Sequence, residues 1–165
     1  MKPQAPSPPR TPSRRLPLWG LLAALLLAGC RTCPALSPVD LTAPGWKLRQ
    51  GQAVWRSKPE APEIAGELLL ATHSDGRAFL QFTKTPIPFV VVQTASNAWQ
   101  IEFVADNRTY SGHGTGPGRI GWLQVARSFT GATPKPPWHW EDRPGNGWRL
   151  ENQRSGETIE GYLTP

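Results

Sequence analysis

The chain has 165 residues, of which 18 are Lys or Arg and 12 are Asp or Glu, so its formal net charge is +6. Four of the basic residues precede residue 16, and the 14 that follow exceed the acidic residues by only two. Proteins that bind nucleic acid gather Lys and Arg on one face or helix, and no such cluster follows residue 31. The composition therefore argues against a nucleic-acid partner.

The first 29 residues have the features of an export signal. Four basic residues precede an apolar run over residues 18–28, which ends at Leu27-Ala28-Gly29-Cys30. A basic head, a short apolar core and small residues before a cleavage site are typical of a signal peptide. The run has about eleven residues, too few to cross the roughly 30 Å of bilayer hydrocarbon. Leu-Ala-Gly-Cys resembles the lipobox of bacterial lipoproteins, which implies cleavage before Cys30 and attachment of lipid to that cysteine.

The two cysteines, Cys30 and Cys33, have the Cys-x-x-Cys spacing of a redox pair. Such a pair normally lies where a strand meets a helix, whereas here Pro34 follows and an export segment precedes. We therefore expect lipid on Cys30 and a free thiol on Cys33. Residues 30–45 are rich in proline, which fixes the backbone and removes hydrogen-bond donors. They are expected to form an extended tether to a domain over residues 46–165.

From residue 46 onward, the sequence predicts short antiparallel strands. Asp75-Gly76 lies between two apolar runs and is a strong hairpin signal. Because parallel neighbours need a long crossover, strands joined by tight turns favour an antiparallel sheet. The predicted strands are residues 52–56, 66–73, 77–84, 89–93, 99–103, 108–111, 148–151 and 158–163.

One segment, at about residues 119–130, departs from strand periodicity. Trp122, Val125, Ala126 and Phe129 recur at the spacing that forms one apolar stripe on a helix. A lone amphipathic helix beside antiparallel strands usually covers the sheet. The expected fold is mainly β: an open antiparallel half-barrel or curved sheet with one covering α-helix.

A glycine-rich stretch precedes this helix. Gly116, Gly118 and Gly121 match the dinucleotide-binding pattern G-x-G-x-x-G. That motif needs a buried parallel strand and a βαβ unit, neither of which is predicted, and Pro117 interrupts it. We interpret the stretch as a loop that leads into the helix.

No arrangement of residues predicts catalysis or metal binding. The histidines His73, His113 and His139 lack the spacing of metal ligands. The sequence has no nucleophilic serine motif, and its carboxylates are scattered over turns and polar strand faces. We therefore predict a non-enzymatic protein with no cofactor and no metal site.

Tryptophan is unusually frequent, and seven of the eight tryptophans follow residue 45: Trp46, Trp55, Trp99, Trp122, Trp138, Trp140 and Trp148. These indoles would form a core, since each buries a large apolar area. They would alternatively line a lipid cavity or form a sugar-binding platform. In a strand, Trp138 and Trp140 would lie on the same face, so they are the candidate platform.

The layout of the chain resembles the lipoprotein-carrier family of LolA and LolB. The shared features are the lipobox, the early Trp46 and Trp55, the hairpins, the single helix and the final hairpin. The resemblance spans residues 46–165. It implies an open half-barrel with a helical lid over an apolar cavity. It also implies a LolB-like acceptor of acylated lipoproteins from a periplasmic carrier. The chain is shorter and has one helix where the family has more. The segment Pro86-Ile87-Pro88-Phe89 is a candidate counterpart of the family's membrane-inserting loop.

The expected function is that of a lipid-anchored protein that binds lipid or acylated-lipoprotein cargo at the periplasmic face of the outer membrane. Arg31 stands where aspartate retains lipoproteins at the inner membrane in well-studied envelopes, which favours the outer membrane. An apolar cavity of several hundred cubic ångström would support this function. Its candidate lining residues are Trp99, Ile101, Phe103, Trp122, Val125 and Phe129. The alternative is an envelope interaction or glycan-binding lipoprotein that uses exposed, coplanar Trp138 and Trp140.

Overall fold

The computed structural model describes residues 35–164, so the expected signal peptide, Cys30 and Cys33 lie outside the described residues. The described chain forms one open sheet of antiparallel strands with one α-helix, which confirms the predicted fold class. The strands are β1 (Trp46–Arg56), β2 (Ile64–His73), β3 (Ala78–Lys84), β4 (Ile87–Ala95), β5 (Ala98–Phe103), β6 (Arg108–His113), β7 (Trp138–Arg143), β8 (Gly147–Asn152) and β9 (Thr158–Leu163). The helices are the short 3₁₀-helix η1 (Val104–Asp106) and α2 (Gly121–Ser128).

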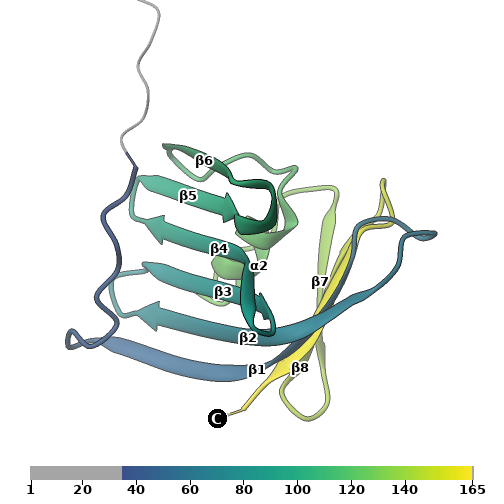
Figure 1. The fold of residues 1–165 in the computed structure, drawn as a ribbon, viewed down its shortest axis with the longest axis horizontal. Coiled ribbons are helices and arrows are strands. Elements are labelled where there is room, and N and C mark those ends of the chain that lie inside the picture. Colours follow the sequence, from purple (N-terminus) through teal and green to yellow (C-terminus); the bar gives the residue numbers. More distant parts are fainter. Residues whose placement is uncertain (1–34, 165) are drawn as a thin grey trace, which may run out of the picture. The chain divides into compact units, whose positions relative to one another are not determined.

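The sheet has nine strands in the order β6-β5-β4-β3-β2-β1-β9-β8-β7 (Figure 1). The chain runs through β1 to β6 as consecutive hairpins and then continues through α2 to β7 at the opposite edge. The last strand, β9, returns to pair with β1 over Gly51–Arg56. This long-range pairing joins the first strand of the domain to its last, and β6 and β7 remain the two edges.

The sheet bends sharply where β1 meets β9, and glycine permits the bend. A Cβ atom added at Gly51 would lie 1.9 Å from the carbonyl oxygen of Tyr162, and one added at Gly161 would lie 2.2 Å from that of Gln52. Glycine in a strand often marks a corner at which another backbone approaches closely. Beyond this corner, β7, β8 and β9 run steeply across the direction of β3 to β5 (Figure 1).

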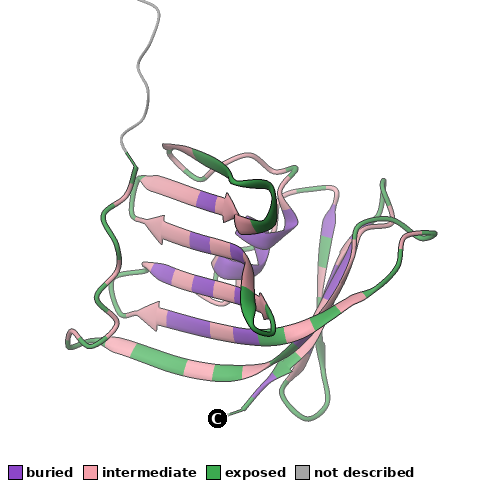
Figure 2. Cartoon of the chain, viewed as in Figure 1, coloured by how far each residue is buried: buried purple, intermediate pink, exposed green. Residues whose placement is uncertain are grey.

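Helix α2 lies on the concave face of the bent sheet. It packs against β3 and β4 on one side and against β7 and β8 on the other. Trp122, Val125 and Ala126 of the predicted apolar stripe are buried, whereas Phe129 is half-buried. Trp122 stacks on Phe82 with ring centroids 4.8 Å apart. Figure 2 shows buried residues along α2 and in the middle of β2 to β5. The helix is shorter than predicted because Ile120 is extended and Gly131 has a φ of +87°.

Residues 35–45 run past the ends of the strands at the side of the sheet where β5 begins (Figure 1). The backbone N–H of Leu36 donates a hydrogen bond to Oε1 of Gln100 at 2.8 Å. This part of the expected tether therefore contacts the folded domain. Among the described residues, no helix is both long and apolar enough to cross a membrane.

Candidate functional site

Three of the six candidate cargo-lining residues lie in the packed core. Trp122 is 1% exposed, and Ile101 and Val125 are fully buried within the same apolar cluster. Trp122 also contacts the ring of Trp55 edge-on at 6.1 Å. These side chains fill the space between α2 and the sheet, so they pack against protein atoms instead of lining a cavity.

The other three candidates lie at separate places. Trp99 lines a hollow of about 90 Å³ at the β4–β5 turn. Phe103 lies at the opposite end of β5. Phe129 directly follows α2 and lies between two hollows of about 370 and 240 Å³. The structure therefore does not bring the six residues around one space.

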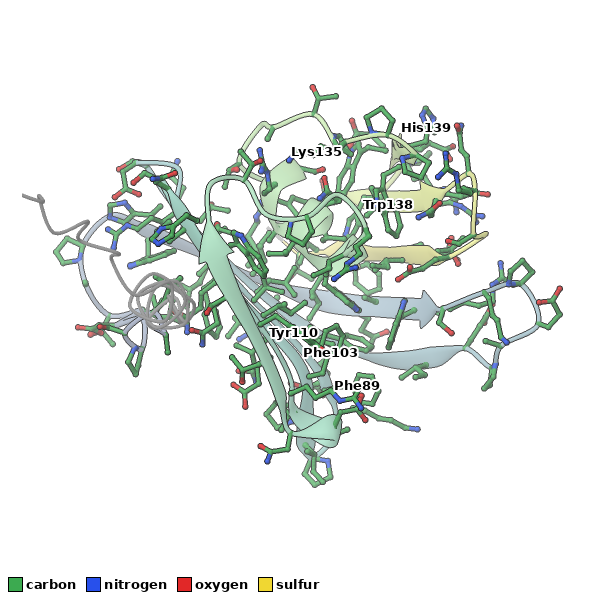
Figure 3. The ribbon with its side chains drawn as sticks, turned by 90° about the horizontal axis from the view of Figure 1, so that it is seen from above. Phe89, Phe103, Tyr110, Lys135, Trp138 and His139 are labelled. Atoms are coloured by element: carbon green, nitrogen blue, oxygen red, sulfur yellow. The ribbon has the colours of Figure 1, made fainter. Side chains whose placement is uncertain are left out.

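Apolar side chains gather at one end of the concave face. It is the end at which strands β1, β3 and β5 finish. Because neighbouring strands are antiparallel, the last residues of β1 and β5 meet the first residues of β2, β4 and β6 at this end. We call this group the rim, and it consists of Trp55, Ile64, Ile87, Phe89, Phe103 and Tyr110. Figure 3 shows Phe89, Phe103 and Tyr110 near one another.

The rim joins the core on one side and is open to solvent on the other. The ring centroid of Phe89 lies 6.3 Å from that of Phe82 and 5.8 Å from that of Trp55. The rings of Phe82 and Trp55 both contact the ring of Trp122. In contrast, Ile87 is 60% exposed and Tyr110 is 44% exposed. The ring of Phe103 lies edge-on to that of Tyr110 with ring centroids 6.3 Å apart. Exposed apolar patches commonly mark an interaction site.

A bulge in β4 accounts for the position of Phe89. Phe82 pairs with Val90 and Thr83 pairs with Pro88, so Phe89 has no partner residue on β3. A bulge inserts one extra residue and re-aims side chains. Phe89 and Val90 are therefore both in contact with the core, although simple alternation would place them on opposite faces. Sequence reasoning named Phe89 only within the candidate counterpart of a membrane-inserting loop and not among the cargo-lining residues. The nearby Pro88 was the available signal, since proline within a strand marks edges and bulges.

No protein-family model matches this sequence, and no curated protein matches it. The assignment of a site therefore depends on the geometry of the described residues.

Trp138 and Trp140 do lie on one face of β7, but that face is the concave one. Trp138 is 6% exposed, and its indole N–H donates to the carbonyl oxygen of Gly118. Trp140 stacks on Trp148 with centroids 5.4 Å apart and donates its N–H to Asp142. The exposed residue between the two is His139 (Figure 3). Because Trp138 is covered, the two indoles do not form an exposed sugar platform.

The glycine-rich stretch forms a loop between β6 and α2. β6 is an antiparallel edge strand, so the loop lacks the parallel strand that a dinucleotide site needs. Two cationic side chains hold the loop in place: Arg127 donates to the carbonyl oxygen of Thr115, and Lys135 Nζ donates to Thr115 Oγ1 at 2.6 Å.

Within residues 35–164, no group of three or more His, Cys, Asp or Glu side chains could hold a metal ion.

A half-buried carboxyl group borders the rim. Glu157 precedes β9, and its Oε1 accepts a hydrogen bond from the indole N–H of Trp55 at 3.0 Å. Burial raises the pKa of Glu157 above its ordinary value, and the hydrogen bond from Trp55 opposes this shift only in part. The charged form of Glu157 is therefore less favourable in the folded protein than in water.

The raised pKa of Glu157 predicts a pH dependence of stability. The folded state holds the proton more tightly, so the free energy of unfolding falls as pH rises from the ordinary glutamate pKa through the raised one. Glu157→Gln keeps an oxygen acceptor for Trp55 and carries no charge. We expect this variant to melt at a higher temperature than wild type at pH 7 and at the same temperature below pH 4.

Thermal melts monitored by circular dichroism from pH 3 to pH 8 measure this difference. Glu60→Gln is the matched control, because Glu60 is exposed in the β1–β2 connection. A pH-independent difference between Glu157→Gln and wild type would contradict the prediction.

Proposed function

We propose that this chain is a lipid-anchored, non-enzymatic protein whose domain binds an acyl chain of lipid or lipid-modified cargo on the rim. The observation that carries the proposal is the open end of the concave face, where apolar side chains continue from the core to the solvent. Helix α2 packs over β3, β4, β7 and β8 and contacts the rim at Trp55, whereas Ile87 and Tyr110 of the rim stay exposed.

The rim suits a flexible apolar ligand better than a rigid polar one. Its side chains are aromatic or aliphatic, and they extend across the ends of five strands. Burial of apolar surface contributes roughly 25 cal/mol per Å². An acyl chain laid along Phe103, Tyr110 and Ile87 would remove their exposed surface from water without requiring a preformed cavity.

The position of the expected tether supports an acceptor role. Leu36 contacts Gln100 near the start of β5, whereas Phe103 at the end of β5 belongs to the rim. The chain thus enters the domain at the end of the sheet opposite the rim. With lipid on Cys30 in the outer membrane, the rim would be available to a soluble periplasmic carrier, as in the LolB-like role that the sequence suggests.

The rim proposal predicts the behaviour of a surface variant. Ile87 and Tyr110 are the most exposed rim residues, so changing both to serine should leave the fold intact. We expect Ile87→Ser/Tyr110→Ser to weaken binding of a fluorescent palmitoyl peptide by roughly tenfold or more, because two partly buried contacts of about 1 kcal/mol each are lost. Fluorescence anisotropy of the peptide measures the affinity.

Leu48→Ser is the matched control, because Leu48 is 49% exposed on β1 outside the rim. It should leave the affinity for the palmitoyl peptide unchanged. Equal binding by wild type and the double serine variant would contradict the proposal, and so would the absence of palmitoyl-peptide binding to wild type.

A further inference from the structure

A second part of the concave face is also uncovered, at the end of β1 far from the rim. A hollow of about 370 Å³ lies there between β1, the end of α2 and the β7–β8 turn. A neighbouring hollow of about 240 Å³ lies on the other side of Phe129, between β1 and the β2–β3 turn. Phe129 lines both hollows.

Two cationic side chains of β1 line these hollows. Lys47 pairs with Thr72 and Arg49 pairs with Leu70, so alternation places both on the concave face. Arg49 lines the larger hollow and Lys47 the smaller. The guanidinium of Arg49 lies 5.0 Å from the centroid of the Phe129 ring, at the distance of a cation–π contact.

Within residues 35–164, neither Lys47 nor Arg49 forms a salt bridge. Arg49 is half-buried, where an unpaired charge costs more than at the open surface. Among the other side chains that line the hollows, Arg143 pairs with Glu160, and His73 Nδ1 lies 2.8 Å from a carboxylate oxygen of Asp75. The carboxylate of Asp142 also lines the larger hollow and accepts the indole N–H of Trp140. Of the Lys and Arg side chains that line the hollows, Lys47 and Arg49 are therefore the ones without a salt bridge, and the cations Lys47, Arg49 and Arg143 outnumber the single carboxylate, Asp142.

The wall beside Arg49 is apolar. Phe129 contacts Trp148 edge-on with ring centroids 5.5 Å apart, and both rings line the larger hollow together with Leu163. A ligand that fills this space would therefore meet a cation at one place and apolar surface next to it.

We propose that these hollows form a binding site for a small anionic amphiphile, with a phosphate or carboxylate head and a short apolar body. The head binds Arg49 and Lys47, since guanidinium groups hold such oxyanions through paired, charge-assisted hydrogen bonds. The apolar body packs on Phe129, Trp148 and Leu163. This site lies at the other end of β1 from Trp55 and does not depend on the acyl-binding function of the rim.

Isothermal titration of the full-length chain in phosphatidylcholine nanodiscs tests this site, with titration into empty nanodiscs subtracted. The probes are hexyl phosphate, 1-hexanol and inorganic phosphate. We expect hexyl phosphate to bind at least about tenfold more tightly than either of the others. A hydrogen-bonded charge pair is worth about 1.5–3 kcal/mol, so Arg49→Gln should weaken hexyl phosphate by roughly tenfold or more.

Lys58→Gln is the matched control, because Lys58 is an exposed cation of the β1–β2 connection and lines neither hollow. It should leave the affinity for hexyl phosphate unchanged. An unchanged melting temperature of Arg49→Gln shows that any loss of binding is local. Equal affinity for hexyl phosphate and 1-hexanol, or no effect of Arg49→Gln, overturns the anionic half of the proposal. Equal affinity for inorganic phosphate overturns the apolar half.

Discussion

Replacement of Trp122 by alanine should lower the free energy of unfolding by about 3–5 kcal/mol, the usual cost of truncating a buried aromatic residue. Trp122 is 1% exposed, stacks on Phe82 and contacts Trp55 edge-on. Its removal leaves a cavity between α2 and the sheet. Because small domains are stable by only about 5–15 kcal/mol, this loss should be evident in a urea titration followed by circular dichroism.

The same experiment shows whether α2 belongs to the core or acts as a detachable lid. Trp46→Ala is the comparison variant, because Trp46 is half-buried at the start of β1, where it contacts His73. We expect it to cost clearly less than Trp122→Ala. A loss below about 1 kcal/mol for Trp122→Ala would mean that α2 separates from the sheet at little cost, contrary to the packed arrangement described here.

The second large effect is expected at the corner of the sheet. In Gly51→Ala, the new Cβ would lie 1.9 Å from the carbonyl oxygen of Tyr162, so the backbones of β1 and β9 must separate. Overpacking of this kind typically costs about 1–3 kcal/mol and occasionally more. We expect a cost at or above the upper end of that range, because the clash involves backbone and not a flexible side chain.

Gly118→Ala is the matched control for Gly51→Ala. A Cβ atom at Gly118 would meet Lys135 Cβ at 3.5 Å, which is an ordinary contact, and its φ is not in the left-handed region. This variant should unfold within about 0.5 kcal/mol of wild type in the same urea titration. If both alanine variants were equally stable, the close approach of β1 and β9 would not be the reason for glycine at position 51.

The rim and the hollows beside Phe129 lie at opposite ends of the concave face and differ in charge. The rim side chains are apolar, whereas the hollows contain Lys47 and Arg49. The two proposals can therefore fail separately. Serine at Ile87 and Tyr110 should not alter the binding of hexyl phosphate, and Arg49→Gln should not alter the binding of the palmitoyl peptide.

The prediction of strands, turns and the helix from sequence was largely successful, because these features depend on neighbouring residues. Strand β7 is the exception, since Trp138–Arg143 was not among the predicted strands. Asp75-Gly76 forms the predicted β2–β3 turn, with Gly76 at a φ of +88°. The apolar spacing from Trp122 to Ala126 forms a helix whose stripe faces the sheet. Period-two alternation also placed Trp138 and Trp140 on one face correctly.

The candidate site was predicted less well, because burial depends on residues that are far apart in the sequence. The pattern that placed Ile101 and Trp122 on apolar faces does not distinguish a packed core from a lined cavity. The bulge that turns Phe89 inward depends on how β4 pairs with β3. The unpaired state of Arg49 depends on which carboxylates the fold brings near it.

By itself, the sequence determined the mainly β fold class, through short strands with tight turns and one amphipathic helix. These are local properties of backbone preference and side-chain period. Only the tertiary structure decided that β9 pairs with β1, that α2 fills the concave face, and that part of the rim and the hollows beside Phe129 remain uncovered. The physical reason is that the same apolar residue is core or surface according to what distant parts of the chain pack against it.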